Sequence, residues 1–357
     1  MYICAMKIHE FYSLYDTEEK CIEKFRSIRE PLLPSCPQCG SRNYKWVAKK
    51  RVFECSTCRK RISLTSGTVM EKSKIPMRDW FQTMHLMTSI KQVLSAKEIM
   101  YQLSYDSYES VWLMMMKLRD IMGKRDNEYN LDRWVEVDEA FFPTAIETDL
   151  NRDSLSSGLG SEQMTKVLVI VKSMPVTNIV TALTADANTA NLARATKLID
   201  KSEKFSVKNV VHYVKMFVLD DLSKKTIEKL ILESVNQDTV IVTDAFSSHM
   251  GLNEYFQHFA FVEGKYPERV VTSNLPWVHI IAGECRDAIA AIHRTVNRKY
   301  LQLYLNEYCW KFNRRYFRDS EIQKNDLFER ILRVAATYKS DIKWRDCQSL
   351  PNEGIDE

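Results

Sequence analysis

The sequence predicts a mixed α/β protein whose core is preceded by a small cysteine-rich module and a helical region. Near the N-terminus four cysteines form two Cys-x-x-Cys pairs, a pattern typical of a structural metal site. Apolar residues then recur at helical spacing as far as residue 122. From Trp134 onward the pattern changes to short β-branched runs, with a helical segment between the later ones. This order favours a central sheet covered by helices.

The cysteine pairs are Cys36-Pro-Gln-Cys39 and Cys55-Ser-Thr-Cys58, and fifteen residues separate them. Each Cys-x-x-Cys turn directs two thiolates toward one ion, and two such turns complete the closed tetrahedral coordination of a structural Zn²⁺ site. A redox dithiol, which would need only one pair, and two disulfides are the alternatives. The remaining cysteines are scattered, which suits reduced thiols. The sequence therefore predicts a zinc ribbon.

Basic residues surround these cysteines. Residues 31–125 contain 17 Lys and Arg against 7 Asp and Glu, a net charge of +10, whereas the whole chain carries +4. Residues 286–345 are also basic, with 14 against 7. A polyanion is the expected partner, although a solvated basic surface is the alternative and charge alone does not separate DNA from RNA. The ribbon residues predicted to bind nucleic acid are Lys49, Lys50, Arg51, Arg59, Lys60 and Arg61.

A helix-turn-helix is predicted after the ribbon. Residues 95–103 and 107–122 are amphipathic segments joined by a few polar residues, and Ser95 and Asp106 or Ser107 are suitable N-caps. The first turn of the second helix would enter a major groove of DNA. A helical hairpin with a purely structural role gives the same pattern. The predicted contacts in that turn are Ser107, Tyr108 and Ser110.

Short strands and a long helical run make up the rest of the chain. The strands are expected at residues 134–142, 166–172, 215–220 and 239–243. A helix is expected between the last two strands over residues 223–235, and a long helical run begins beyond Trp277. Residues 174–211 are interpreted as an insertion between the second and third strands, and residues 145–160 as a mobile loop.

Three acidic residues stand where a sheet-based nuclease would hold metal ions. Asp138 lies in the first predicted strand, Asp244 directly follows the fourth, and Glu284 lies near the start of the long helical run. Carboxylates on neighbouring rigid elements can bind two Mg²⁺ or Mn²⁺ ions about 3.5–4 Å apart, the arrangement that supports in-line phosphoryl transfer. Taken singly, each acid has a common alternative role as a turn, cap or surface residue.

Neighbouring residues compete with these acids or support them. Glu136 and Glu139 flank Asp138, and the two-residue period of a strand places Glu136 on the same face as Asp138. Asp287 is the rival of Glu284. Two histidines near the second and third acids are expected to form structural hydrogen bonds rather than act in catalysis. They are His249 and His279.

Several motifs occur together in the chain. They are the ribbon from Cys36 to Met70, Ser73-Lys-Ile-Pro-Met-Arg-Asp-Trp-Phe81, Val135-Glu-Val-Asp-Glu139, Thr243-Asp-Ala, the segment from Val296 to Tyr308, and Phe312-Asn-Arg-Arg315. From about residue 10 to 316 the sequence closely resembles bacterial insertion-sequence transposases that join a zinc ribbon to a DDE nuclease core, a group related to the Merlin elements. The resemblance implies an RNase H-like core with Asp138, Asp244 and Glu284 as its metal-binding catalytic triad.

The resemblance also bears on arginines near the C-terminus. Arg286 stands where such transposases often have Lys, and it is expected to hold a phosphate. Arg314 and Arg315 belong to a basic and aromatic cluster that ends the helical run, and they are predicted to bind nucleic acid.

The predicted organisation has four parts. They are an N-terminal helix and zinc ribbon (1–70), a helix-turn-helix region (71–128), an RNase H-like DDE domain (129–316) and a C-terminal helical tail (317–357). The predicted function is a DNA transposase that binds terminal inverted repeats and, with Mg²⁺ or Mn²⁺, cuts and joins DNA strands. A DNA-binding protein without activity and a structure-specific nuclease are the alternatives. Transposon ends and target DNA are the expected partners, with a homo-oligomer on DNA, and we expect no membrane and a cytoplasmic, or in bacteria nucleoid-associated, location.

Overall fold

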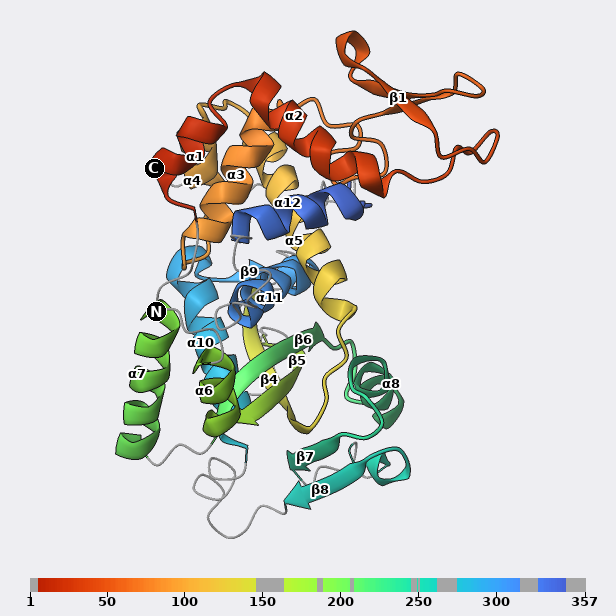
Figure 1. Ribbon diagram of the computed structural model, residues 1–357. Coiled ribbons are helices and arrows are strands. Elements are labelled where there is room, and N and C mark those ends of the chain that lie inside the picture. The colour runs from red at the N-terminus through yellow and green to blue at the C-terminus, as the bar shows by residue number, and fades with distance from the viewer. Residues whose placement is uncertain are drawn as a thin grey trace, which may run out of the picture. The chain divides into compact units, whose positions relative to one another are not determined.

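The computed structural model of the chain describes residues 6–145, 164–184, 189–205, 209–244, 249, 251–261, 275–314 and 327–344. The chain forms two compact units, one from Met1–Arg125 with Gln323–Glu357 and one from Asp126–Ile322 (Figure 1). The predicted mobile loop at residues 145–160 lies outside the described residues, except for Ala145 at the end of a strand. None of the described helices is long and apolar enough to span a membrane.

The cysteine-rich part of the first unit is a small three-stranded antiparallel sheet. Its strands, in the order β1-β2-β3, are β1 (Tyr44–Val47), β2 (Val52–Cys55) and β3 (Arg61–Ser63). Short 3-10 helices, η1 (Glu30–Leu32) and η2 (Ala48–Lys50), lie before the sheet and at the turn between β1 and β2. Phe53 of β2 is fully buried and packs against Trp46 of β1, so this sheet has a small apolar core of its own.

Helices complete the first unit. They are α1 (Ile8–Leu14), α2 (Glu18–Arg29), α3 (Met77–Ser89), α4 (Ala96–Leu103), α5 (Tyr108–Asn127) and α12 (Leu327–Thr337). The predicted N-cap Ser95 is confirmed, because Ser95 Oγ accepts from Glu98 N at 3.0 Å, and Thr17 caps α2 in the same way, with Thr17 Oγ1 accepting from Lys20 N at 3.3 Å. The two predicted helices at 95–103 and 107–122 are present, and four residues separate α4 from α5.

The C-terminal helix α12 is part of the core of the first unit. Phe328 is fully buried, and its ring lies 5.2 Å from Phe11, 5.4 Å from Tyr15 and 5.6 Å from Phe81. The backbone contributes as well, because Val69 N donates to Ala335 O at 3.3 Å. The predicted C-terminal tail therefore belongs to the same compact unit as the N-terminal residues.

The second unit is built on a mixed sheet of six strands. Its order is β6-β5-β4-β7-β8, with β9 paired to β4. The strands are β4 (Trp134–Ala145), β5 (Met164–Pro175), β6 (Asn209–Val218), β7 (Val240–Asp244), β8 (Gln257–Phe261) and β9 (Val296–Asn297). β4, β5 and β6 are antiparallel neighbours, whereas β7 and β8 run parallel to β4. When the strands β4 to β8 are numbered 1 to 5 along the chain, their order in the sheet is 3-2-1-4-5. This is the strand order of an RNase H-like core, so the predicted fold is confirmed.

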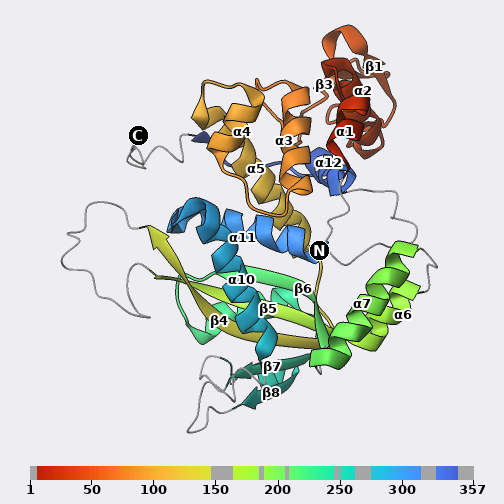
Figure 2. The same cartoon turned by 90° about the vertical axis from the view of Figure 1, so that its left-hand side faces the viewer.

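Helices cover both faces of this sheet. On one face, α8 (Lys224–Ser234) buries Ile227 and Ile231 against Val135, Val137 and other apolar side chains. On the other face, α10 (Pro276–His293) crosses β4 and β5, and α11 (Arg298–Asn313) packs on β6 (Figure 2). The long helical run predicted beyond Trp277 is thus two helices, and the short strand β9 separates them.

The predicted insertion at 174–211 is a helical hairpin next to the ends of β5 and β6. It consists of α6 (Val176–Thr184) and α7 (Thr189–Phe205), which pack against each other (Figure 2). Val176, Val210, Met174 and Leu198 form a small apolar cluster at its base. The hairpin therefore has a small apolar cluster of its own, and it forms the connection between β5 and β6.

Candidate active site and metal centres

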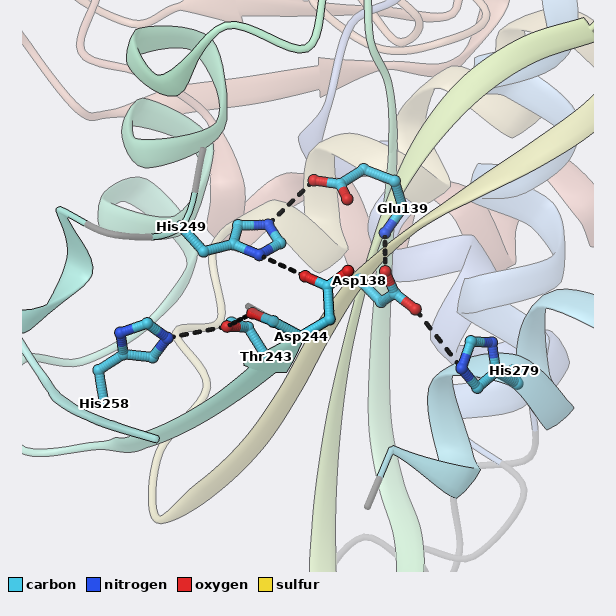
Figure 3. A network of polar contacts seen from close by, with 7 residues as sticks. All are labelled: Asp138, Glu139, Thr243, Asp244, His249, His258 and His279. Carbon is cyan, nitrogen blue, oxygen red and sulfur yellow. Dashed lines mark hydrogen bonds and ion pairs between the residues drawn. The ribbon is translucent and has the colours of Figure 1, made fainter. Parts of the chain in front are cut away.

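The first two predicted acids lie on neighbouring parallel strands. In the register of β4 and β7, Glu136 lies opposite Val242. Two residues further along both strands are Asp138 and Asp244, which therefore point to the same face of the sheet. Figure 3 shows the two carboxylates beside each other. The register of two parallel strands thus brings together residues more than a hundred positions apart in the sequence.

Asp138 lies in an acidic and buried environment. Its relative exposure is 8%, and Glu139 N donates to Asp138 Oδ1 at 2.8 Å. Burial, together with the charges of Asp244 and Glu139, raises the pKa of Asp138 to about 7. Buried carboxylates that repel each other favour a bound cation, and carboxylate oxygens suit Mg²⁺ and Mn²⁺. The residues present therefore fit the predicted divalent metal.

His249 connects two of these acids. Its Nδ1 lies 3.1 Å from Asp244 Oδ1 and its Nε2 lies 2.9 Å from Glu139 Oε1 (Figure 3). Burial works against a charge on this imidazole, but the hydrogen bonds to both carboxylates outweigh it and raise the pKa of His249 to about 9. The structural hydrogen-bonding role predicted for His249 is confirmed. Glu139, which the sequence presents as a competitor of Asp138, forms a hydrogen bond with His249.

The N-terminus of α10 is held by Glu136 from β4. Glu136 Oε2 accepts from Trp277 N at 3.0 Å and from Val278 N at 3.4 Å, and the side chain of the N-cap residue Leu275 forms no capping hydrogen bond. A buried carboxylate at a helix N-terminus satisfies free amide groups and interacts favourably with the helix dipole. Burial nevertheless raises the pKa of Glu136 to about 7. Glu136 therefore fixes where α10 meets the strand that carries Asp138.

The first turn of α10 places His279 beside Asp138. His279 Nε2 lies 3.6 Å from Asp138 Oδ2 (Figure 3). Further along the helix, Arg286 Nη1 donates to Phe141 O of β4 at 3.2 Å. Residues four and seven positions after His279 share its helix face, so this face of α10 is the one turned to β4. The predicted phosphate-binding role of Arg286 stays a prediction.

Glu284 and its rival Asp287 lie elsewhere on α10. Glu284 is five residues after His279, which is about 140° further around the helix. Its side chain is exposed, and Tyr308 Oη of α11 lies 3.5 Å from Glu284 Oε2. Asp287 is exposed as well. The assignment of Glu284 as the third acid of the triad stays a prediction.

In the first unit, the four predicted zinc ligands converge. Their sulfur atoms all lie within 4.8 Å of one another, with Cys36 Sγ 3.5 Å from Cys58 Sγ and Cys39 Sγ 3.6 Å from Cys55 Sγ. Four sulfurs bound tetrahedrally to one zinc ion at about 2.3 Å lie about 3.8 Å apart. Backbone N–H groups of Cys58 and Thr57 lower the pKa of Cys55 to about 6, which favours the thiolate. This cluster could therefore hold Zn²⁺.

The two cysteine turns share one backbone conformation. Gly40 N donates to Cys36 O and Arg59 N donates to Cys55 O, and both donors, four residues after the first cysteine, have positive φ values of 71° and 63°. Glycine adopts this left-handed conformation without steric cost, whereas Arg59 adopts it against its preference. The two halves of the ribbon are thus alike in geometry although their sequences differ.

The basic residues predicted to bind nucleic acid differ in their contacts. Arg59 and Arg61 pair with Glu54 at 3.3 and 2.7 Å, and Arg51 pairs with Glu18 at 3.4 Å. All of these arginines are exposed, as are the remaining ribbon lysines. Those lysines are Lys49, Lys50 and Lys60.

The other predicted nucleic-acid contacts lie on helices. In the first turn of α5, Ser107 and Tyr108 are exposed and Ser110 is half-buried, with Ser110 N donating to Ser107 Oγ at 3.3 Å. Arg314, in the second unit, pairs with the buried Asp126 at 2.7 Å and stacks on Trp310, its guanidinium carbon 4.3 Å from the ring centre. Arg315 lies outside the described residues.

Comparison with known proteins identifies the family. Residues 130–313, just over half of the chain, match the ISXO2-like transposase domain. The chain belongs to this transposase family. The matched segment covers the strands and helices that carry Asp138, Asp244 and His279.

The other comparisons add little. No curated protein matches the chain. Matches among solved structures include a chain from the "Crystal structure of a pre-cleavage Mos1 transpososome", with a TM-score of 0.24 and 9% sequence identity over 71% of this transposase and 73% of that chain.

Proposed function

We propose that this transposase cuts the ends of a DNA element and joins them to target DNA in a reaction that depends on divalent metal ions. One observation supports the proposal above all others: the carboxylates of Asp138 and Asp244 lie on the same face of two adjacent parallel strands, within a buried acidic cluster. Such a cluster favours cations and lies in the part of the chain that matches the transposase family.

The side chains of the site are proposed to have different roles. Asp138 and Asp244 would hold the metal ions, and His249 orients Asp244 by occupying its Oδ1. When bound, the ions would activate water or a 3′-hydroxyl as nucleophile and stabilise the departing oxygen. Glu136 contributes indirectly by fixing α10 against β4. Glu284 is retained here as the predicted third acid of the triad.

DNA recognition is assigned to the first unit. Exposed Lys49, Lys50 and Lys60 would neutralise backbone phosphates, while the exposed first turn of α5 would read bases of the terminal repeats in a major groove. A zinc ion on the four cysteines would hold the ribbon in shape. Because an element has two ends, the chain is proposed to act as a homo-oligomer that holds both.

The test is cleavage of DNA that carries the element's own ends, taken from the genomic sequence on either side of its coding region. Purified, zinc-loaded protein is incubated with this DNA and Mg²⁺ or Mn²⁺, and the products are mapped to single nucleotides. Wild-type protein should cut at the ends and join them to a second DNA. Asp138→Asn should lose cleavage by at least a thousandfold and keep DNA binding, because only the metal-binding charge is removed.

Asp238→Asn is the matched control, since Asp238 is an exposed acid next to the same strand β7 and should leave cleavage unchanged. Cleavage by Asp138→Asn at the wild-type rate would refute the assignment. Wild-type protein that binds the ends but cuts neither with Mg²⁺ nor with Mn²⁺ would favour the alternative of a DNA-binding protein without activity. Cutting without joining would favour a structure-specific nuclease.

A further inference from the structure

The edge of the six-stranded sheet carries two exposed aromatic rings. β8 is the last strand in the order of the described sheet, and among the described strands it pairs with β7 alone. Phe259 is 49% exposed and Phe261 is 37% exposed. Edge strands commonly carry charged residues, which discourage contact with other chains, but β8 contains no Lys, Arg, Asp or Glu. Two large apolar side chains exposed together on such a strand indicate a surface that binds a partner.

The strand register places these rings on the face of the two acids. Phe261 lies opposite Asp244 in the pairing of β7 and β8, and Phe259 lies opposite Val242. Asp138 of β4 is level with Asp244, because each lies two residues beyond a registered pair of β4 and β7. Residues that lie opposite each other on parallel strands point to the same face of the sheet. Asp138, Asp244 and Phe261 therefore form one row across three neighbouring strands.

His258 holds β8 in this register from the other face. Its Nε2 lies 2.8 Å from Thr243 Oγ1 of β7 (Figure 3), and its Nδ1 lies 2.9 Å from Asn253 Oδ1. His258 lies opposite Ile241, whose side chain belongs to the apolar core under α8. Successive side chains of a strand alternate between the faces, so Phe259 points away from that core. The position of the two rings is thus fixed by the backbone and by these hydrogen bonds.

The neighbourhood of Phe261 decides which ligand suits the ring. The strands that carry Phe261 and Asp244 are about 4.8 Å apart. In the proposed function, Asp244 holds an ion at the phosphate that is cut. The nucleotides on either side of that phosphate therefore lie beside the ring of Phe261. A base offers a flat π-face, which is the surface that an aromatic side chain stacks on.

A phenyl ring can stack only on a base that has left the double helix. Within a duplex each base is covered on both faces by its neighbours, so a base must be unpaired and unstacked before a side chain can cover it. Stacking on aromatic side chains stabilises such a displaced base. Phenylalanine has no hydrogen-bonding group, so it accepts any of the four bases. The row of two acids and a ring therefore suits a phosphate next to an unpaired base.

We infer that Phe261, with Phe259 beside it, is a stacking platform for a base that is unpaired next to the cut. This inference rests on the proposed function and deepens it, because the duplex must then open at the end of the element for cleavage. An end whose bases are already mismatched at the cut site should consequently depend less on Phe261 than a fully paired end.

The first experiment measures end cleavage by the full-length, zinc-loaded protein with Mg²⁺ or Mn²⁺. Phe261→Leu keeps an apolar side chain without an aromatic face, and it should slow cleavage of paired ends by about 5- to 150-fold, the loss expected for one base stack. Phe261→Tyr should cut at close to the wild-type rate. Tyr255→Leu is the matched control and should leave cleavage unchanged, because Tyr255 is 44% exposed but precedes the opposite end of β8. Mismatched bases at the cut site should restore most of the rate of Phe261→Leu.

The second experiment requires no change at Phe261. 5-Iodouracil is placed at single positions around the cut site of uncut end DNA, and the complex with Asp138→Asn, which should bind this DNA without cutting it, is irradiated. Iodouracil crosslinks efficiently to an aromatic ring that stacks on it. One position next to the cut should therefore crosslink to the peptide that contains Phe261, identified by mass spectrometry.

The outcomes separate the two proposals. If wild-type protein cuts no end DNA, or if Asp138→Asn cuts as fast as wild type, the proposed function itself fails. If those two results are as expected, cleavage of paired ends by Phe261→Leu at the wild-type rate overturns the stacking inference, and so does the absence of a crosslink to the Phe261 peptide. Equal slowing on paired and mismatched ends, together with loss of self-association in sedimentation without DNA, would assign β8 to contact with a second copy of the chain and overturn the inference as well.

Discussion

Truncation of Phe328 tests whether the C-terminal helix is part of the first unit. The side chain is fully buried, and the rings of Phe11, Tyr15, Phe81 and His85 lie within 5.9 Å of its own. A buried Phe→Ala change costs about 3–5 kcal/mol. Ring contacts of this kind add about 0.5–1.5 kcal/mol each to the stabilisation that comes from buried apolar area. For Phe328→Ala we therefore expect a loss in the upper half of the range of about 3–5 kcal/mol. Such a loss is a large part of the 5–15 kcal/mol that stabilises a typical domain.

Hydrogen exchange followed by mass spectrometry locates the effect, because it reports on each unit separately. In Phe328→Ala the slowest amides of α3 should exchange roughly a hundred to several thousand times faster, since about 1.4 kcal/mol corresponds to a factor of ten. Amides of β4 and β5 in the second unit should keep their rates. Phe259→Ala is the matched control, because this phenylalanine is 49% exposed and should cost less than about 0.5 kcal/mol. Unchanged protection of α3 in Phe328→Ala would refute the reasoning.

Three further predictions concern zinc, pH and a buried ion pair. Cys55→Ser should lower the bound zinc from about one ion per chain to near zero, measured by atomic emission. Ser56→Ala, a change at an exposed neighbour, is the control, and full zinc content in Cys55→Ser would argue against the site. Burial lowers the pKa of His85 to about 4, so the folded protein binds fewer protons than the unfolded protein between about pH 4 and 6.5. The free energy of unfolding should therefore be highest above about pH 6.5 and should fall by up to about 3 kcal/mol as the pH drops to about 4. Urea unfolding of the first unit at pH 7.5 and 5 measures this loss, and His85→Leu, which cannot titrate, should show a smaller one; an equal loss would rule out His85 as the cause. Asp126→Ala should destabilise the second unit by about 3–5 kcal/mol in urea unfolding, because it leaves Arg314 buried without its partner. If Asp126→Ala is as stable as wild-type protein, Arg314 does not depend on this pair.

Much of the fold could be predicted from local sequence patterns. The strands at 134–142 and 239–243 and the helix at 223–235 are present, because each has a clear apolar period and, for the helix, the cap Ser223. The edge strand β8 was missed, since most of its residues are exposed and it lacks the alternation that marks a half-buried strand. The packing of α12 was also missed, because contact with residues some three hundred positions earlier leaves no local signal.

The same limit applies to the candidate site. Asp138 and Asp244 could be found because each lies at or near the end of a β-branched run, where strand register brings side chains together. The position of His279 depends on how α10 docks on Glu136, and a helix gives no local indication of which face will meet a sheet. Glu284 lies about 140° around α10 from His279, because five positions separate the two residues, and its assignment as the third acid stays a prediction.

The return of the chain to its first unit has a consequence for synthesis on the ribosome. Residues 126–322 form the second unit and are complete as a sequence before α12 is made. The second unit can therefore begin to fold while the first still lacks the helix that carries Phe328. A frameshift near the 3′ end of the coding sequence would give a protein that ends before α12. That protein would retain the acidic cluster of the second unit, but its first unit would lack α12.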